Sequence, residues 1–411
     1  MNTKKNIFIV CLLSICFFIM SCGKDTVEQN DAVEDVDTSE SDKVITDADI
    51  LEQTMLDLDK YSLRSESDDS SDIHLELTYV SKSEYGYYFY EIDHSKRIFL
   101  LMFYEPESGQ AIPLCSRPDC RHNSEECNAY FINISLDKEE YLDSYLQYYD
   151  GFLYVIGVDP EYNVSLYRVS ADGSSREKYM HLYKADVTSI QSDSSLPGNQ
   201  THFRHPDVYI YQDYVYYIDS KEMLPKIRRM KLGTDETEII FESDVERAML
   251  YRMHFYGDYL FFQTAHYTDD SYSELDGGIY AYNIQNGEMS LVKKDAIAPY
   301  CVCDKYLYYN NLNGISKFNL ESGEDIVIVS DEELIFPYVN EQYIIAYGDD
   351  SVVFYAHSGE EMYRVSTKDL LHFLGGDSRY LFAQSKGWGI AIIELSKVDE
   401  QKAKWKVISD N

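Results

Sequence analysis

Residues 249–294 read MLYRMHFYGDYLFFQTAHYTDDSYSELDGGIYAYNIQNGEMSLVKK. This stretch contains four runs of aromatic and β-branched residues, MLYRMHFY, YLFFQTA, GIYAYNI and EMSLVKK, and each has the composition typical of a β-strand. Asn286-Gly287 joins the last two runs, and Asn-Gly is the strongest short signal for a hairpin turn. The stretch therefore predicts a unit of four antiparallel strands.

The same unit recurs along the chain in two independent patterns. An aromatic residue after a turn opens a strand seven times, and a tight glycine turn follows in each of the first six units. The aromatic anchors are Tyr87, Phe152, Tyr214, Tyr259, Tyr306, Tyr343 and Tyr380, and the glycines are Gly109, Gly173, Gly233, Gly287, Gly323 and Gly359. The seventh unit has Ser396 to Asp399 where its glycine turn would fall. Because each turn glycine follows its aromatic anchor in the same order, the two patterns together indicate structural repeats.

Radially repeated four-stranded units form a β-propeller, so we predict an all-β fold with about seven four-stranded blades. Six or eight blades are the alternatives, because the terminal units of a ring often share one blade. Residues 74–80 (HLELTYV) are the candidate closing strand beside the last strand, 404–409 (KWKVIS). An open solenoid and a two-sheet sandwich fit units of this length less well. The 39 tyrosines suit stacked sheets whose hydroxyl groups reach water or polar partners.

The N-terminal residues 1–21 have the organisation of a signal peptide. Lys4 and Lys5 precede an apolar run from Ile7 to Met20, which is short for a membrane-spanning helix. The run ends in Ser21-Cys22-Gly23, which resembles the lipobox of bacterial lipoproteins. That resemblance implies cleavage before Cys22, lipidation of Cys22 and a protein held to a bacterial membrane on its extracytoplasmic side, at the cell surface. An ordinary signal peptide that contains a cysteine is the alternative.

Residues 22–72 are predicted to be the lipidated cysteine followed by a disordered acidic tether. Residues 24–72 contain 17 Asp and Glu against four Lys and Arg, and Tyr61 is their one aromatic residue. Such a composition cannot repay the entropy of ordering the chain. A short helix over 49–61 is the alternative for one part, because Ile50, Leu51, Met55 and Leu58 fall near helical spacing. The propeller then occupies residues 73–411.

The formal charge of the whole chain is −36, and this value bears on its partners. Nucleic acid is excluded as a partner class, because phosphate binding needs clustered Lys and Arg. Cations and neutral ligands such as glycans are compatible with the charge. The plainest interpretation of the charge is solubility.

The second unit carries a resemblance to a known family. Asp150-Gly151, Leu153-Tyr154, Leu166-Tyr167-Arg168 and Asp172-Gly173 resemble the repeats of bacterial surface-lipoprotein propellers, which are grouped as a domain of unknown function. These are similar in turn to the YWTD propellers of low-density lipoprotein receptors. The resemblance covers most of residues 75–410 and is weaker in units one, six and seven; Tyr216-Tyr217-Ile218-Asp219 is the nearest stretch to YWTD itself. It implies a propeller without an assigned activity.

A cysteine-rich stretch, CSRPDCRHNSEEC, lies at residues 115–127 within a predicted insertion at 110–142. Cys115, Cys120, His122 and Cys127 form a Cys₃His set that suits a structural zinc ion. Pro118 and Asn123 are candidate turn residues that let the chain curl around the ion. A disulfide is the main alternative, with Cys301 or Cys303 as the partner, and a free redox-active thiol is the third. No catalytic position is assigned in any of the three interpretations.

The remaining signals for chemistry are weak. The chain has no HExxH, GxSxG or phosphate-binding loop motif. His202 and His205 have a metal-like spacing, and the acidic group Asp269, Asp270, Glu274 and Asp276 could gather calcium, but solvated loops explain both better. We therefore predict a non-enzymatic propeller that binds a glycan, peptide or protein. The alternative is an envelope-side glycan hydrolase or lyase with carboxylates lining the propeller channel.

Overall fold

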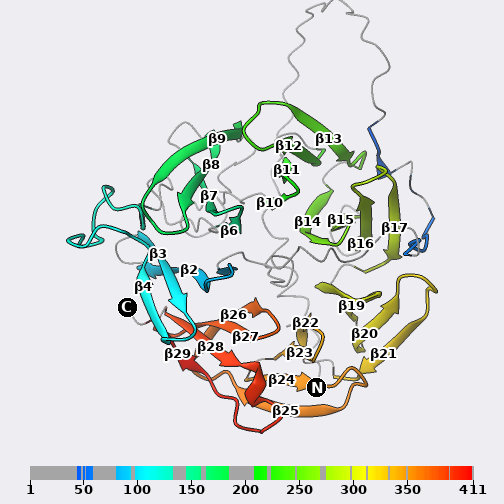
Figure 1. Cartoon of the computed structure of the whole chain (residues 1–411). Helices are drawn as coiled ribbons and strands as arrows, with labels where there is room; N and C mark the ends of the chain where they lie inside the picture. Colours follow the sequence, from blue (N-terminus) through cyan, green and yellow to red (C-terminus); the bar gives the residue numbers. More distant parts are fainter. Residues whose placement is uncertain are drawn as a thin grey trace, which may run out of the picture.

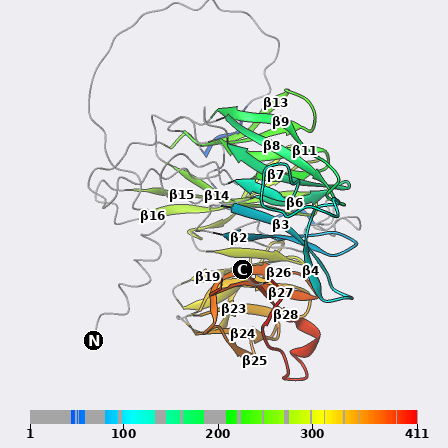
Figure 2. The same ribbon diagram turned by 90° about the vertical axis from the view of Figure 1, so that its left-hand side faces the viewer.

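A computed structural model describes residues 44–47, 50, 52–58, 80–93, 98–132, 145–158, 163–184, 208–219, 224–245, 248–268, 275–296, 299–311, 313–331, 334–348, 350–387 and 389–409. Seven antiparallel sheets are arranged around a central axis as a seven-bladed β-propeller (Figure 1). Figure 2 shows the ring from its side. The predicted fold class is confirmed. The predicted signal peptide, Cys22, and the pair His202 and His205 lie outside the described residues.

The strands of each blade are consecutive in the chain, and they are ordered within the sheet from the central axis outward (Figure 1). Blades 1 to 3 contain β1 (Val80–Lys82), β2 (Tyr87–Asp93), β3 (Ile98–Glu105), β4 (Gln110–Pro113) and β5 (Tyr130–Ile132); β6 (Leu146–Tyr149), β7 (Phe152–Val158), β8 (Asn163–Ser170) and β9 (Arg176–Lys184); β10 (Val208–Tyr211), β11 (Tyr214–Asp219), β12 (Lys226–Lys231) and β13 (Thr237–Glu242). Blades 4 and 5 contain β14 (Met249–Tyr256), β15 (Tyr259–Tyr267), β16 (Leu275–Asn283) and β17 (Met289–Lys294); β18 (Tyr300–Cys303), β19 (Tyr306–Asn311), β20 (Gly314–Asn319) and β21 (Asp325–Val329). Blades 6 and 7 contain β22 (Ile335–Val339), β23 (Ile344–Tyr347), β24 (Ser351–Tyr355) and β25 (Glu361–Ser366); β26 (Leu370–Gly376), β27 (Tyr380–Ser385), β28 (Ile390–Glu394), the 3-10 helix η2 (Leu395–Lys397) and β29 (Lys406–Val407).

The glycine turns lie where the repeat predicts them, between the third and fourth strands of blades 1 to 6. Each of the six glycines has a positive φ, for example 75° at Gly287 in the Asn-Gly turn of blade 4. L-residues with a side chain adopt this conformation at a cost, which explains the glycine. Blade 7 lacks such a glycine, and its chain instead passes through η2 before it reaches the short strand β29.

Of the predicted closing strand at residues 74–80, only Val80 lies within the described residues. β1 begins at Val80 and pairs with β2 in blade 1, whereas β29 pairs with β28 in blade 7. No blade is shared between the two ends of the described chain, because each sheet is built from consecutive strands. Within the described residues, side-chain contacts join blades 7 and 1 at the closure.

The core of the ring lies in the seams between the blades. The described residues form seven hydrophobic clusters, and each joins two neighbouring blades; the one at the closure packs Val80 and Phe89 of blade 1 against Leu374 and Phe382 of blade 7. Within the described residues, no helix is long and apolar enough to span a membrane.

Tyrosine hydroxyl groups connect successive blades at the tight turns. Tyr149, Tyr211 and Tyr256 each end the innermost strand of a blade. The hydroxyl group of Tyr149 donates to Asp213 at 2.8 Å, that of Tyr211 donates to the carbonyl oxygen of Gly257 at 2.7 Å, and that of Tyr256 accepts the N–H of Asp304 at 2.6 Å. These hydroxyl groups thus find polar partners in the next blade, as the tyrosine-rich composition predicts.

Part of the predicted tether packs along the outer rim of the ring. We call residues 44–58 the strap. Its described residues form parallel bridges from Thr46 to Glu242 of β13 and from Gln53 to Leu291 of β17, and they contain no α-helical turn. Figure 1 shows this blue segment on the outer side of β13 and β17. Leu56 is buried in the seam between blades 4 and 5. For these residues, the linker interpretation is wrong, and the segment docks on the body without the helical conformation of the alternative.

Asp47 gives the strap a pH-dependent contact with blade 3. The hydroxyl group of Ser243 donates to its carboxylate at 2.5 Å. Burial raises the pKa of Asp47 above its ordinary value of 3.8; the bond from Ser243 opposes this shift and Asp244 adds to it. A carboxylate whose folded-state pKa is raised destabilises the fold when it ionises, and this cost is relieved as the pH falls through the raised pKa toward 3.8.

We therefore predict that Asp47→Asn raises the free energy of unfolding at pH 7 by about 0.5–1 kcal/mol. The amide keeps an acceptor for Ser243 and removes the buried charge. Urea unfolding from pH 7 down to pH 3.5 should show the difference from the unmodified chain shrinking as the pH falls. Asp57→Asn, on an exposed residue of the same strap, is the control. An equal gain at every pH would contradict this origin of the effect.

Candidate metal centre

The cysteine-rich stretch interrupts the outermost strand of blade 1. β4 pairs with residues 102–105 of β3, and β5 pairs with residues 98–100 of the same strand, both antiparallel. The intervening residue, Leu101, donates its N–H to the carbonyl oxygen of Ala129 and accepts the N–H of Leu114, each at 2.8 Å. Residues 114–129 therefore form a loop between β4 and β5, which lie end to end beside β3. The hydrogen bonds to Leu101 hold both ends of this loop.

This arrangement corrects the predicted bounds of the insertion. Residues 110–113 form β4, a regular fourth strand of the blade, and residues 130–132 form β5 in line with it. The described insertion is the loop 114–129. The prediction for residues 133–142 lies outside the described residues.

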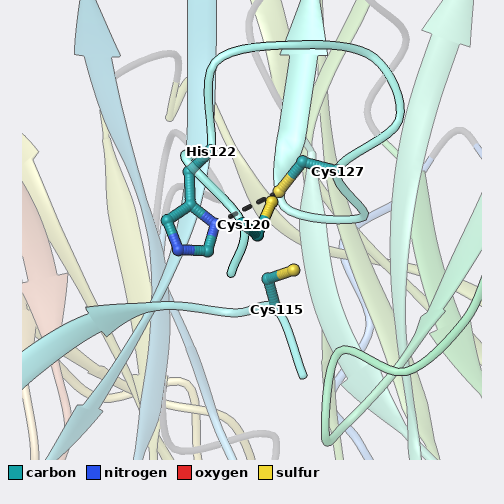
Figure 3. Close-up of side chains that lie close together, drawn as sticks. All are labelled: Cys115, Cys120, His122 and Cys127. Carbon is teal, nitrogen blue, oxygen red and sulfur yellow. Dashed lines mark hydrogen bonds between the residues drawn. The ribbon is translucent and has the colours of Figure 1, made fainter. Parts of the chain in front are cut away.

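The loop brings four potential ligands together. The sulfur atoms of Cys115, Cys120 and Cys127 and a ring nitrogen of His122 all lie within 4.8 Å of one another. Figure 3 shows the three thiols and the imidazole converging, with Nδ1 of His122 3.3 Å from Sγ of Cys127. Cys127 is fully buried, and Cys115, Cys120 and His122 are partly exposed. The predicted metal-ligating residues are thus neighbours in space.

Local turns curl the chain around this centre. The N–H of Cys120 bonds to the carbonyl oxygen of Arg117 at 3.2 Å, across the turn that contains Pro118. The N–H of Cys127 bonds to the carbonyl oxygen of Ser124 at 2.9 Å. His122 has a φ of 52°, a left-handed conformation that reverses the chain between the two cysteines.

The neighbouring blade supports the loop. Gly173 in the β8–β9 turn lies so close that a Cβ atom there would meet the carbonyl oxygen of Leu114 at 2.5 Å. The carbonyl oxygen of Gly173 accepts the side-chain N–H of Asn128 at 2.9 Å. Arg176 of β9 donates to the carbonyl oxygens of Glu125, at 2.8 Å, and Tyr130. The centre therefore holds blade 1 and blade 2 together.

Hydrogen bonds and burial act in opposite directions on two of the thiols. The backbone N–H of His122 lowers the pKa of Cys120, and Arg117, whose guanidinium donates to its sulfur at 3.4 Å, acts in the same direction. Burial raises the pKa of Cys127. Arg117 also donates to the carbonyl oxygen of Glu126 at 2.7 Å, so this cation is fixed over the loop.

The donor set fits a zinc ion. Zn²⁺ takes sulfur at about 2.3 Å and nitrogen at about 2.0–2.1 Å in a tetrahedron, which places two donors about 3.5–3.8 Å apart. In the structure the distances between the four donor atoms are at most 4.8 Å, which exceeds the spacing in such a tetrahedron by only about 1 Å. Four protein donors fill a tetrahedral shell, an arrangement typical of structural zinc sites. It is the only such group of metal-ligating side chains within the described ranges.

The disulfide alternative with Cys301 or Cys303 is contradicted by their positions. Both lie on β18, the innermost strand of blade 5, buried in the seam with blade 6. The Cys₃His loop lies on the outer side of blade 1, against blade 2. A disulfide needs Cα atoms within about 7 Å, which excludes this pairing. All five described cysteines are free thiols.

Cys303 has a structural explanation that the sequence pattern did not reveal. It pairs with Tyr306 across the turn that follows β18. In the same way Tyr211 pairs with Tyr214, and Tyr256 pairs with Tyr259. Cys303 thus replaces the tyrosine that ends the innermost strand in blades 2 to 4. Aligning the units on the residue before each turn could have identified it as part of the repeat.

The predicted acidic group at 269–276 is described only at Asp276. Its carboxylate accepts the N–H of Gly277 at 2.8 Å, while Asp269, Asp270 and Glu274 lie outside the described residues. The calcium interpretation of this group stays untested.

Comparison with known proteins supports the fold. No protein-family model and no curated protein matches the chain. A prolyl endopeptidase structure matches with a TM-score of 0.50 and 15% identity, over 86% of this chain and 54% of that one. A structure of the tricorn protease matches with a TM-score of 0.48 and 11% identity, over 80% of this chain and 36% of that one. TolB from Acinetobacter baumannii matches with a TM-score of 0.37 and 9% identity, over 77% and 65%.

The chain spans about half of the prolyl endopeptidase and about a third of the tricorn protease. A nidogen/laminin complex also matches, with a TM-score of 0.33 and 12% identity, over 52% of this chain and 75% of that one. At these identities the likeness shows the propeller fold alone. The resemblance to surface lipoproteins stays a prediction, because no family model matches.

Proposed function

We propose that this chain is a lipid-anchored, extracytoplasmic propeller that binds a glycan, peptide or protein partner, with a structural zinc ion in blade 1. The observation that carries the proposal is the closed Cys₃His set. Its four donors would fill the tetrahedral shell of a zinc ion and would leave no position for a substrate or a reactive water. The best-formed site among the described residues therefore acts on the fold rather than on a substrate.

The position of the centre agrees with a structural role. The loop lies on the rim of the ring, and its contacts reach the strand it interrupts and the adjacent turn of blade 2. A bound zinc ion would be coordinated by the thiolates of Cys115, Cys120 and Cys127 and by the imidazole of His122. These bonds would fix the loop in the arrangement that Asn128 and Arg176 already support. A rigid ring of this kind suits a binding module that presents its loops to a partner.

The anchoring proposal rests on the sequence. The order of Lys4-Lys5, the apolar run to Met20 and Ser21-Cys22-Gly23 supports export and lipidation of Cys22. Two acyl chains would hold the protein stably at the membrane. The partners proposed are then the membrane, through the lipid, and an extracytoplasmic glycan, peptide or protein. The net charge of −36 disfavours nucleic acid.

Cys22→Ala tests the anchoring. In a bacterial host, we expect the unmodified chain to fractionate with membranes and to incorporate labelled fatty acid. The Cys22→Ala variant should lose the label and accumulate as a precursor that still carries residues 1–21. Cys11→Ala, within the apolar run, is the matched control and should retain label and processing. Equal labelling of the Cys22→Ala variant, or a cytoplasmic unmodified chain, would overturn the proposal.

A further inference from the structure

Main-chain hydrogen bonds hold the strap to the ring near both of its ends. At blade 3, the N–H of Glu242 in β13 donates to the carbonyl oxygen of Ile45 at 3.0 Å. At blade 5, the N–H of Leu56 donates to the carbonyl oxygen of Leu320 at 2.9 Å, in the turn before β21. The strap is therefore joined to the blades on both sides of blade 4, in addition to its bridge to β17.

Apolar side chains fasten the strap into two seams of the ring. Ile45 and Ile50 pack against the hydrophobic cluster between blades 3 and 4. Leu56 belongs to the cluster between blades 4 and 5, where Leu58 packs against it. The Leu56 side chain is 6% exposed, as a core residue would be. The strap is therefore part of the folded body, although it precedes the first blade in the sequence.

Docking of the strap shortens the chain between the proposed lipid and the body. Val44, the first described residue of the strap, lies 22 positions after Cys22. A fully extended chain of that length spans at most about 75 Å. Val80, the first residue of β1, lies 58 positions after Cys22, and a chain of that length spans at most about 200 Å. The contacts of the strap therefore limit how far the ring can stand from a membrane that holds Cys22.

The strap meets the body at the outer edge of one blade. β13 is the outermost strand of blade 3, and Thr46 bridges to Glu242 at its end. Figure 1 shows the start of the strap outside β13, while β25 of blade 6 lies on the opposite side of the axis. β1, in contrast, is the innermost strand of blade 1. Attachment through the strap thus holds the ring at its rim, whereas attachment through β1 would hold it beside its axis.

We propose that the strap holds the ring by the outer edge of blade 3, so that this edge is the part of the propeller nearest the membrane. The two faces of the ring, which carry the turns between the strands, are then accessible to the glycan, peptide or protein partner. The inference rests on the proposed lipid at Cys22 and adds the orientation of the body to it. It also gives a role to the buried apolar residues of an otherwise acidic segment.

The test compares how far two matched positions lie from a bilayer. Asp235 and Glu360 are exposed residues of the turn between the third and fourth strands, in blades 3 and 6 respectively. A donor dye is attached through a non-natural amino acid at either position of the full lipidated chain, in phosphatidylcholine vesicles that contain an acceptor-labelled lipid. Energy transfer from position 235 should exceed that from position 360 about twofold or more. A ring that lies flat on the bilayer, or turns freely, would give equal transfer and would overturn the inference.

Two insertions of one Gly/Ser segment of about 20 residues identify the strap as the cause. Inserted after Lys43, the segment about doubles the chain between the lipid and blade 3, so the ratio of the two transfers should fall toward one. Inserted after Ser65, beyond the strap, the same segment is the matched control and should leave the ratio unchanged. Both sites lie outside the described residues, so neither insertion removes a contact described above. Equal effects of the two insertions would contradict the proposal.

A second form of the chain makes the result independent of the lipid. A histidine tag replaces residues 1–22, and the vesicles contain a nickel-chelating lipid in place of the lipid on Cys22. The same two ratios are then measured. If the chain proves not to be lipidated, unequal transfer in this form still supports the role of the strap, and equal transfer overturns it. The anchoring proposal and this inference therefore fail separately.

Discussion

Replacement of Cys127 by alanine is expected to abolish zinc binding and to lower the free energy of unfolding by about 4 kcal/mol. That value is the linkage stabilisation given by a ligand present at about 1,000 times its dissociation constant. Cys127 is the buried ligand of the set, and its sulfur contacts the His122 ring. Without it, three donors remain, and the loop 114–129 loses the bond that ties its far end to Cys115 and Cys120. Urea unfolding and metal analysis of the same preparation measure both effects.

Cys301→Ala provides the matched control. Cys301 is as buried as Cys127, but it lies in the seam between blades 5 and 6, away from the Cys₃His set. Its replacement removes one sulfur atom from a packed core, and we expect a loss of about 1 kcal/mol with unchanged zinc. If the two variants lose the same stability and neither preparation contains zinc, the metal centre does not exist.

Asp377→Ala is expected to lower the free energy of unfolding by about 3–5 kcal/mol, through the seam that closes the ring. The Asp377 side chain is fully buried in the turn between β26 and β27. It accepts the hydroxyl group of Tyr87 at 2.6 Å and lies 3.5 Å from Nζ of Lys82, both in blade 1. It also accepts the N–H groups of Arg379 and Tyr380 at 2.8 and 2.7 Å. Alanine leaves all of these partners unsatisfied at the seam between blades 7 and 1.

Asn340→Ala is the comparison for the turn, although the Asn340 side chain also donates one hydrogen bond, at 3.3 Å, to the backbone carbonyl oxygen of Asp377. Asn340 holds the corresponding turn of blade 6, where its side-chain oxygen accepts the N–H groups of Gln342 and Tyr343 at 2.9 and 2.8 Å. It lacks the ion pair and the tyrosine from blade 1. We expect a loss of about 1–2 kcal/mol from this control. Similar losses in thermal or urea unfolding of the two variants would show that the closure has no special weight.

The repeat was predictable because each unit carries its own local signals. The four strands of residues 249–294 lie within about three residues of the predicted runs, and Gly287 has the positive φ that its hairpin requires. Such signals depend on neighbours in the sequence, so one unit is sufficient to indicate them. The seventh unit shows the same dependence. It lacks the turn glycine, and in its place the structure has the 3-10 helix η2.

Contacts between distant parts of the chain were not predictable in the same way. Residues 74–79 of the predicted closing strand lie outside the described residues. A contact that the structure does show at the closure, between Tyr87 and Asp377, joins side chains 290 positions apart. The strap was interpreted as a linker because its acidic residues dominate its composition. Its docking depends on Ile45, Ile50, Leu56 and Leu58, which pack against the seams on either side of blade 4.

The candidate metal centre was partly predictable. The spacing of Cys115, Cys120, His122 and Cys127 indicated a ligand set, and the structure brings the four together. The sequence did not indicate that the loop interrupts an outer strand, or that Gly173 and Arg176 of the next blade support it. Nor did it separate Cys301 and Cys303 from the set, because that separation depends on which blade each residue occupies.

The measurement that tests the central claim most directly is zinc content together with free thiols on one preparation of the full chain, exported to the oxidising side of a membrane. We predict about one zinc per chain. Cys115, Cys120 and Cys127 should resist a thiol reagent until a chelator removes the ion, and chelation should lower the stability of the chain. A preparation without metal, in which two of these three cysteines form a disulfide, would contradict the account.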